Sequence, residues 1–268
     1  MAHHSADITV MVRAAEKAAR SLVRDFGEVE NLQVSRKGPG DFVSVADKQA
    51  ESIIHDDLSY TRPGYGFLME ESGEIKGDGE MADNRFIIDP LDGTTNFLHG
   101  LPHWCISIGL ERDGVISAGV IYDPIKDEMF WSEKGAGCFV NKRRCRVSAR
   151  RDPETALFST GQLRTHVADE TGLRRVEQVM DTGASVRRYG AGALDIAYVA
   201  AGRFDGFWEV GLKPWDMAAG TIMIQESGGY IGEIGGGKNH LYAGNVFASN
   251  LNFRNKIGKI LRGEKLDT

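Results

Sequence analysis

Two aspartates at the end of an apolar run are the residues in this sequence whose types and spacing best suit chemistry. Ile87 and Ile88 lead into Asp89 and Asp92, and a glycine, two threonines and an asparagine follow at 93–96. A buried strand of this kind delivers carboxylate oxygens to one point, and oxygen ligands suit Mg²⁺. The segment therefore predicts a divalent-metal site, and phosphate chemistry is the reaction that we expect there.

Three further acidic residues are expected to join this pair. Glu70 ends another apolar strand, Asp216 begins an apolar helix, and Asp47 lies near the start of a different helix. Taken alone, Glu70 is typical of a solvated surface pair with Glu71, and Asp216 of a helix N-cap. Asp47 alone is typical of an acid that complements a helix dipole. Taken together, the carboxylates suffice for two metals about 3.5–4 Å apart that clamp an in-line displacement. The lack of nearby His and Cys favours Mg²⁺ or Mn²⁺ over zinc.

Thr94 and Thr95 follow the Asp-Gly turn, and they have two interpretations. Hydroxyls at such a position often cap a helix. Alternatively, one hydroxyl orients a water for attack, and the backbone N–H groups of the helix start face a phosphate. The sequence has no cysteine beside an obvious activating base and no Asp-x-Asp pair at a strand end. It therefore indicates no covalent nucleophile. We therefore expect direct attack by water.

Composition limits the classes of protein that this chain can belong to. Its 268 residues are 41% hydrophobic and 26% charged, which is ordinary for a globular domain. The net charge of −6 argues against a general nucleic-acid binder but not against phosphate substrates. Three widely spaced cysteines argue against a disulfide framework or a zinc ribbon and favour a reducing cytoplasm. We expect no signal peptide and no membrane span, since no apolar run approaches ~20 residues.

The first half of the chain predicts two helices against a largely antiparallel sheet. Helical apolar spacing covers about 5–26, ending at Gly27, and a second helix is expected from Val45 to about Ser59. Residues 37–40 are expected to form a loop, and Asp113-Gly114 predicts a hairpin. The expected strands are 66–69, 85–88, 105–111, 115–122 and 128–132.

Strand and helix patterns alternate in the second half, which predicts an α/β layer. The expected strands are 157–160, 185–189 and 204–210, and the expected helices are 169–180, 193–201 and 215–227. We expect one compact domain over 1–268, of mixed α/β (α+β) class. It would have two subdomains, about 1–150 with most metal ligands and 151–268 with Asp216 and the substrate pocket, meeting near 145–155.

Four motifs in order resemble the inositol monophosphatase family of magnesium-dependent, lithium-sensitive phosphatases. They are Asp41–Asp47, Glu70-Glu71-Ser72, Asp89–Phe97 and Trp215–Gly220, and they span nearly the whole chain at the family's usual spacing. The segments 189–198 and 207–209 are similar to those of the bacterial SuhB-type members. The resemblance implies a layered αβαβα sandwich of the inositol monophosphatase / fructose-1,6-bisphosphatase type, and a homodimer.

The resemblance also implies roles for particular residues. Glu70, Asp89 and the Leu91 carbonyl would hold a first metal, and Asp89, Asp92 and Asp216 a second. A third metal would lie near Glu70, largely through water. Thr94, helped by Asp47, would position the attacking water, and the backbone N–H groups of Gly93, Thr94 and Thr95 would donate to the phosphate. Gly190, Gly192 and Glu209 would line the polyol pocket. Glu71 and Lys37 would act as supporting residues. The stretch 160–162 receives no role.

The substrate stays open between several phosphate esters. Myo-inositol monophosphate is favoured because Glu209 suits a hydroxylated ring, and histidinol phosphate, fructose 1,6-bisphosphate and adenosine 3′,5′-bisphosphate are the alternatives. Residues 142–151 carry six basic side chains, which are typical of a solvated strand edge. The same segment could instead bind RNA or RNA polymerase, as regulatory relatives do. His99 and His103 are interpreted as packing or loop residues.

Overall fold

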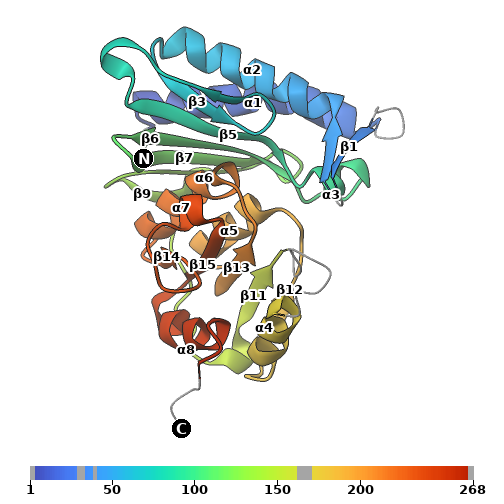
Figure 1. Cartoon of the computed structure of the whole chain (residues 1–268), viewed down its shortest axis with the longest axis vertical. Helices are drawn as coiled ribbons and strands as arrows, with labels where there is room; N and C mark the ends of the chain where they lie inside the picture. Colours follow the sequence, from blue (N-terminus) through green and yellow to red (C-terminus); the bar gives the residue numbers. More distant parts are fainter. Residues whose placement is uncertain (1–3, 29–33, 39–40, 162–170, 265–268) are drawn as a thin grey trace.

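The computed structural model describes residues 4–28, 34–38, 41–161 and 171–264, with the side chains of 34–44 excepted. Within these residues, Figure 1 shows alternating layers of helix and sheet, running from α1 and α2 at one end to α4 and α8 at the other. Three separate groups of buried apolar side chains fill the spaces between helices and sheets. The predicted mixed α/β class and αβαβα sandwich are therefore confirmed.

The larger sheet contains eight described strands in the spatial order β10-β9-β8-β7-β6-β5-β3-β4. Its neighbours are antiparallel except β3 and β5, which run parallel, so the predicted largely antiparallel sheet is confirmed. The strands are β3 (Gly66–Met69), β4 (Gly73–Ile75), β5 (Asn84–Asp92), β6 (Cys105–Arg112), β7 (Val115–Asp123), β8 (Glu128–Glu133), β9 (Gly137–Val140) and β10 (Arg143–Cys145).

The predicted hairpin at Asp113-Gly114 joins β6 to β7. Arg112 pairs with Val115, and both turn residues have positive φ, 50° for Asp113 and 74° for Gly114. Two consecutive positive φ values match the right-handed twist of the flanking strands, and Asp-Gly tolerates them well. The local sequence therefore determines the pairing next to this turn, up to the register shift between Leu110 and Glu111.

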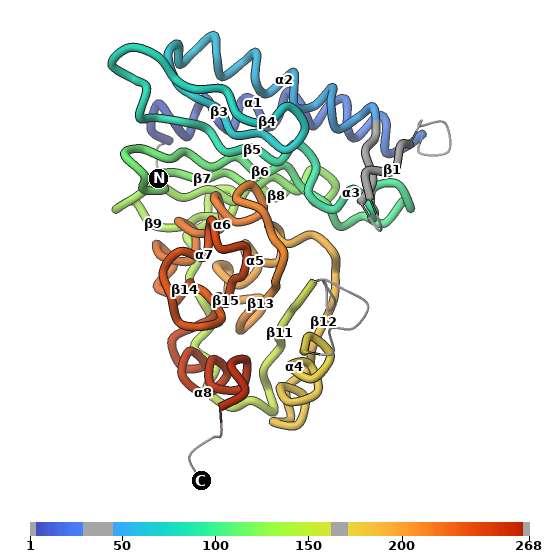
Figure 2. The backbone as a smooth tube through the Cα atoms, in the orientation of Figure 1, coloured from blue at the N-terminus to red at the C-terminus, as the bar shows by residue number. Residues whose placement is uncertain are grey.

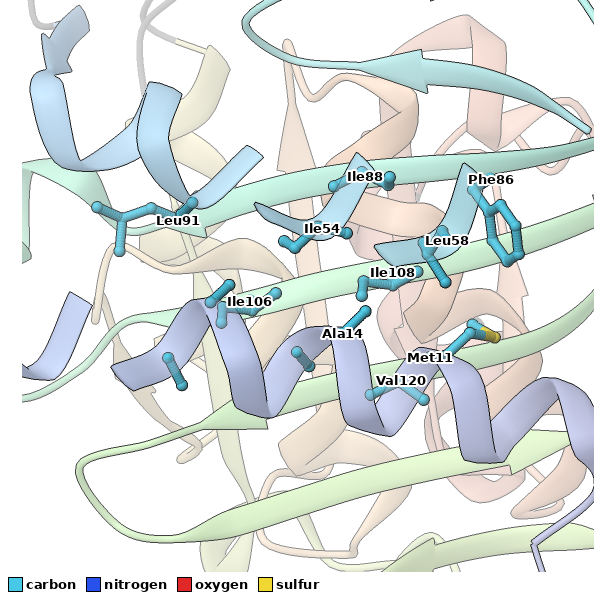
Figure 3. Close-up of a cluster of buried hydrophobic side chains, with 14 of the residues drawn as sticks. Met11, Ala14, Ile54, Leu58, Phe86, Ile88, Leu91, Ile106, Ile108 and Val120 are labelled. Atoms are coloured by element: carbon cyan, nitrogen blue, oxygen red, sulfur yellow. The ribbon is translucent and has the colours of Figure 1, made fainter. Parts of the chain in front are cut away.

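Helices α1 (Ala6–Phe26) and α2 (Val45–Thr61) cover one face of the larger sheet. The Ser5 hydroxyl caps α1 by accepting a hydrogen bond from the Ile8 N–H at 3.2 Å. Figure 3 shows apolar side chains of both helices meeting those of the strands: Met11, Ala14, Ile54, Leu58, Phe86, Ile88, Ile106 and Ile108. Burying each large side chain stabilises the layer by about 1.5–3 kcal/mol.

Helices α5 (Gly192–Ala200) and α6 (Pro214–Glu226) lie between the two sheets, with the short α7 (His240–Ala243) nearby. Both long helices are apolar around most of their circumference, as expected for helices buried on two sides. Gly119 on β7 lets α6 approach closely, because a β-carbon there would lie 2.7 Å from the Ala219 Cα. This contact holds α6 tightly against β7.

The smaller sheet contains five described strands in the order β12-β11-β13-β15-β14. Strands β11, β12 and β13 run parallel, while β15 is antiparallel to its neighbours. Helices α4 (Thr171–Met180) and α8 (Leu251–Leu261) cover its outer face. The strands are β11 (Leu157–Thr160), β12 (Ser185–Arg187), β13 (Gly206–Val210), β14 (Tyr230–Gly232) and β15 (Asn245–Ser249).

Two expectations about elements need correction. Residues Lys37 and Gly38 belong to β1 (Val34–Gly38), which pairs with β2 (Asp41–Ser44), so the loop predicted over 37–40 was wrong at its start. The pairing of two separate segments supplies backbone hydrogen bonds that local propensity does not reveal. The strand predicted over 185–189 was too long, because β12 ends at Arg187. After residue 227 the chain continues with β14, α7, β15 and α8. Two 3₁₀ turns, Gly79–Met81 and Pro153–Thr155, complete the described elements.

The chain passes from one sheet to the other between Cys145 and Leu157. The tube in Figure 2 shows this single passage below β9, leading to β11. We propose that the expected subdomain boundary near 145–155 falls there. Among the described helices, none combines the length and apolar character that crossing a membrane requires.

Candidate active site

Two aspartates, Asp89 and Asp92, lie at the C-terminal end of strand β5. Ile87 and Ile88 are fully buried, and the pairing of β5 with β6 becomes irregular between Asp89 and Asp92. Such an irregularity re-aims side chains and ends strand pairing. Asp89 is only 2% exposed, and its Oδ1 accepts a hydrogen bond from the Leu91 N–H at 3.0 Å. The chain therefore bends so that the Leu91 N–H contacts the Asp89 side chain, and the carboxylates of Asp89 and Asp92 lie close together.

Asp216 reaches the same point from α6. Its Oδ2 accepts a hydrogen bond from the Lys213 N–H at 2.7 Å, and this fixes the carboxylate in the first turn of the helix. The Ser107 hydroxyl on β6 donates to the Trp215 carbonyl at 3.1 Å, which holds that turn against the sheet. Asp89, Asp92 and Asp216 each place an oxygen within 4.8 Å of the others, the grouping expected of a metal site.

Glu70 lies beside this group of three. Strand β3 runs parallel to β5 with Met69 opposite Ile88, and the Glu70 N–H donates to the Ile88 carbonyl at 3.2 Å. The Glu70 charge is close enough to raise the pKa of Asp89. The structure thus brings together four of the five acidic residues that the sequence singled out, all except Asp47, with Glu70 outside the 4.8 Å group.

A buried acidic residue that received no role from the sequence supports the segment after β3. Glu51, on α2 and 2% exposed, accepts a hydrogen bond from the Glu71 N–H at 2.8 Å through its Oε2. It therefore fixes the turn that follows β3. An acidic residue on the apolar side of a helix was the signal that could have identified it.

Crowding of these carboxylates in a region shielded from water has an electrostatic cost. Burial raises the pKa of Asp89 well above its usual value, and the charges of Glu70, Asp92 and Asp216 raise it further. Burial is also the main cause that raises the pKa of Asp92 and of Asp216 to about 7. The Ala193 N–H opposes this rise at Asp92 by donating to Oδ2 at 2.8 Å. Divalent cations would relieve the repulsion, so the residues present fit a metal site.

The glycine-threonine segment forms the turn into α3 (Thr94–Leu98). Gly93 has φ 92°, and a β-carbon there would lie 3.0 Å from the His103 carbonyl, so both the conformation and the space favour glycine. The Thr94 hydroxyl donates to the Leu91 carbonyl at 2.9 Å, whereas Thr95 is exposed. Asp47 is 2% exposed in the first turn of α2. A contact between Asp47 and Thr94 remains a prediction.

Asn96 joins this turn to a distant segment. Its Nδ2 donates to the His103 carbonyl at 2.8 Å and to the Tyr189 carbonyl at 2.7 Å. The His103 ring lies against Tyr189 and near Asp195, in keeping with its interpretation as a packing residue. Asn96 received no role from the sequence, in which its place directly after two threonines was the available signal, and the structure buries it.

Glu209 on β13 lies between two glycines. It is 9% exposed, and a β-carbon at Gly161 would overlap its carboxylate. A β-carbon at Gly192 would lie 3.7 Å from the Glu209 Oε2, and one at Gly190 would lie 3.5 Å from the Asn96 Nδ2. Gly161, which received no role from the sequence, therefore makes the space that Glu209 occupies. Of the two expected supporting residues, Glu71 is described, whereas the Lys37 side chain lies outside the described residues.

Comparisons with known proteins agree with this fold. The family model described as "Inositol monophosphatase family" matches residues 4–264. An inositol-1-monophosphatase of Mesorhizobium japonicum is 54% identical over 92% of both chains. The Nus factor SuhB of Escherichia coli is 39% identical over 91% of both chains. The crystal structure of the extragenic suppressor protein suhB from Bartonella henselae has a TM-score of 0.92 at 54% identity, covering 96% of this chain and 99% of the other.

The sandwich fold, the carboxylate group and these matches define a phosphoric monoester hydrolase. The chain belongs to the inositol monophosphatase family, as the extent of the family match shows. The family membership that the four motifs predicted is therefore confirmed.

Proposed function

We propose that this protein hydrolyses myo-inositol monophosphate to inositol and phosphate in a Mg²⁺-dependent reaction. The observation that carries the proposal is the convergence of Asp89, Asp92 and Asp216 within 4.8 Å, with Glu70 beside them. The name of the 54% identical relative supports inositol 1-phosphate as the substrate. Histidinol phosphate and fructose 1,6-bisphosphate remain the alternative substrates.

The acidic residues would hold two or three cations. Glu70, Asp89 and the Leu91 carbonyl would bind one, while Asp89, Asp92 and Asp216 would bind a second. A third would lie near Glu70, mainly through water. All of these donors are oxygens, which favours Mg²⁺, with Mn²⁺ as the substitute. When bound, the cations supply Lewis-acid stabilisation of the phosphate and of the leaving oxygen.

The protein's own groups would then orient the reactants. The Thr94 hydroxyl already donates its hydrogen to the Leu91 carbonyl, so its oxygen is left to accept a hydrogen bond from the attacking water. Asp47 would assist Thr94 in holding that water. The backbone N–H groups of Gly93, Thr94 and Thr95 would donate to the phosphate oxygens. Direct attack by water would invert the configuration at phosphorus.

Glu209 would select the alcohol part of the substrate. As a carboxylate it accepts hydrogen bonds, and the adjacent Gly161 and Gly192 leave its oxygens unobstructed by β-carbons. Gly190 and Gly192 would line the same pocket, while Glu71 and Lys37 would support the metal site. A ring that carries several hydroxyls suits this pocket better than an imidazole does.

The decisive experiment compares kcat/KM for four substrates in the presence of Mg²⁺. These are inositol 1-phosphate, histidinol phosphate, fructose 1,6-bisphosphate and adenosine 3′,5′-bisphosphate. We expect the highest value for inositol 1-phosphate and no turnover with excess chelator. A higher value for any other member of the panel would contradict the proposed substrate, and turnover with chelator would contradict the metal requirement.

We also propose that the protein is a homodimer in the cytoplasm. The family resemblance supports the dimer, and the unpaired cysteines are in keeping with a reducing compartment. Sedimentation equilibrium of the purified chain tests the dimer, and a mass of one chain at micromolar concentration would contradict it. Fractionation of the source cells tests the location.

A second candidate function is binding to RNA or RNA polymerase. Two observations favour it: the SuhB relative is named a Nus factor, and Arg143 and Arg144 are exposed on edge strand β10. Binding of RNA and of polymerase should be measured at physiological salt for the native chain and for the double variant Arg143→Glu and Arg144→Glu. Equal binding by both proteins, or none by the native one, would exclude this surface.

A further inference from the structure

Two cysteines face each other in the hairpin at the edge of the larger sheet. Strands β9 and β10 are antiparallel, and their register places Cys138 directly opposite Cys145. Asn141 at the turn has φ 53°, which suits a tight two-residue connection. The backbone N–H groups of Gly135 and Gly137 donate to the Glu226 carboxylate at 2.8 and 3.0 Å, which anchors the start of this hairpin to α6.

The two sulfur atoms are only 3.1 Å apart. Directly opposed residues in an antiparallel pair have Cα atoms roughly 4.5–5.5 Å apart. Disulfides span Cα separations of about 4.4–6.8 Å. A bond between these sulfurs therefore needs little movement of either strand.

The surroundings distinguish the two thiols. Cys145 is 8% exposed and ends the edge strand β10, whereas Cys138 is fully buried. The hydrogen bond shared with Cys138 is the main cause that lowers the pKa of Cys145; burial opposes this shift, and the positive charges of Arg203 and Arg143 support it. The same pairing raises the pKa of Cys138. Cys145 is thus the thiol that ionises first and that a small oxidant meets first.

We propose that Cys138 and Cys145 form a reversible oxidation site, a dithiol that hydrogen peroxide converts to an intrachain disulfide. The Cys145 thiolate attacks one peroxide oxygen, the O–O bond breaks, and hydroxide leaves and takes up the proton that Cys145 had lost. The Cys138 thiol then attacks the resulting sulfenic acid sulfur. The S–O bond breaks as the S–S bond forms, and the departing hydroxide leaves as water with the Cys138 proton. Overall, two thiols are oxidised by two electrons and one peroxide is reduced to two waters.

The remaining cysteine provides an internal control. Cys105 on β6 is fully buried, and its Sγ donates to the Asp92 Oδ2 at 3.7 Å instead of facing a second cysteine. A buried cysteine that lacks a neighbouring sulfur is inert, because an oxidant does not reach it and no second thiol is available for a disulfide. Oxidation should therefore consume two of the three thiols and spare Cys105.

The test treats the full-length protein with hydrogen peroxide under native conditions and then digests it with trypsin without reductant. Cleavage after Lys134, Lys142, Arg144 and Arg146 separates the two cysteines into peptides 135–142 and 145–146. We expect these peptides to remain joined, with a mass two hydrogen atoms below their sum, and to separate after dithiothreitol. Separate peptides after oxidation, or a modified Cys105 in place of the pair, would overturn the proposal.

Two variants test the order of the steps by dimedone labelling. Cys138→Ser should leave a sulfenic acid on Cys145 that dimedone traps, because the second thiol is missing. Cys145→Ser should leave Cys138 unlabelled. The opposite labelling would overturn the assignment of Cys145 as the attacking group. If either variant fails to fold, the rate of thiol loss decides: Arg143→Gln should slow it, whereas Lys142→Gln, at the preceding turn residue, should not. Equal rates for these two would also overturn the assignment.

Discussion

The carboxylate of Glu209 occupies the space that a β-carbon at Gly161 would take. Gly161 directly follows β11, and Glu209 lies on the neighbouring parallel strand β13, on which Trp208 pairs with Thr160. The two residues are therefore held side by side by the sheet. The proposed substrate pocket therefore requires glycine at position 161, although this position is far from Glu209 in the sequence.

Gly161→Ala should displace the Glu209 carboxylate and weaken substrate binding. Loss of a hydrogen bond to a charged group costs about 1.5–3 kcal/mol, so we expect KM for inositol 1-phosphate to rise by about tenfold or more. Glu209→Gln should act in the same direction. The activating Mg²⁺ concentration should stay the same in both variants. Gly235→Ala, at an exposed glycine whose β-carbon would meet nothing within 4 Å, is the matched control. An unchanged KM in Gly161→Ala would exclude this role.

Asp89→Asn should abolish magnesium-dependent turnover without unfolding the protein. The change removes a charge that both proposed cations share, and loss of residues that merely support metal ligands already costs about 10–100-fold. We expect kcat to fall by more than about 100-fold. The metal-free variant should unfold at a higher temperature than the native chain, because one crowded charge is gone. Asp113→Asn, an exposed turn position, controls for charge. Near-native kcat would refute the ligand scheme.

Stability of the metal-free protein should fall as the pH rises. The folded-state pKa values of Asp92 and Asp216 are about 7, against the ordinary 3.8. The folded state therefore binds more protons than the unfolded state between about pH 4 and 7, and the stability present below this window is lost across it. Added Mg²⁺ should raise Tm more at pH 8 than at pH 5, because it binds the deprotonated groups. Thermal melts with chelator and with Mg²⁺ measure this, and equal Tm gains at both pH values would count against it.

Lithium should inhibit the reaction by competing at the second cation position. Its small size and single charge allow it to occupy the site of Asp92 and Asp216 without matching the charge of Mg²⁺. We expect inhibition of inositol 1-phosphate hydrolysis at millimolar lithium, with sodium at the same ionic strength as the control. Full activity at high millimolar lithium would contradict this assignment.

Asn96→Leu should destabilise the fold and separate two parts of the site. The variant leaves the His103 and Tyr189 carbonyls without their donor, and an unsatisfied polar group costs about 1–3 kcal/mol. We expect the free energy of unfolding to fall by about that amount and KM to rise, because Tyr189 precedes the glycines of the substrate pocket. Urea unfolding and steady-state kinetics measure the two effects. A change in stability with native KM would limit Asn96 to a structural role.

The sequence by itself predicted the class of enzyme and determined much of the local structure. Acidic residues next to apolar runs predicted the oxygen-ligand site, and Asp113-Gly114 predicted a hairpin, because these signals depend on neighbours along the chain. The four motifs predicted the family and its layered fold. Such patterns are local, so they can be recognised without knowing which segments meet.

Only the tertiary structure decided which distant residues share space. The parallel pairing of β3 with β5 places Glu70 beside Asp89, and the packing of α6 against β6 and β7 brings Asp216 to the same point. The contacts of Gly161 with Glu209 and of Glu51 with the Glu71 backbone also depend on this packing. Pairing and close packing between remote segments leave no periodic signal in either segment, and for this reason sequence reasoning missed these two residues.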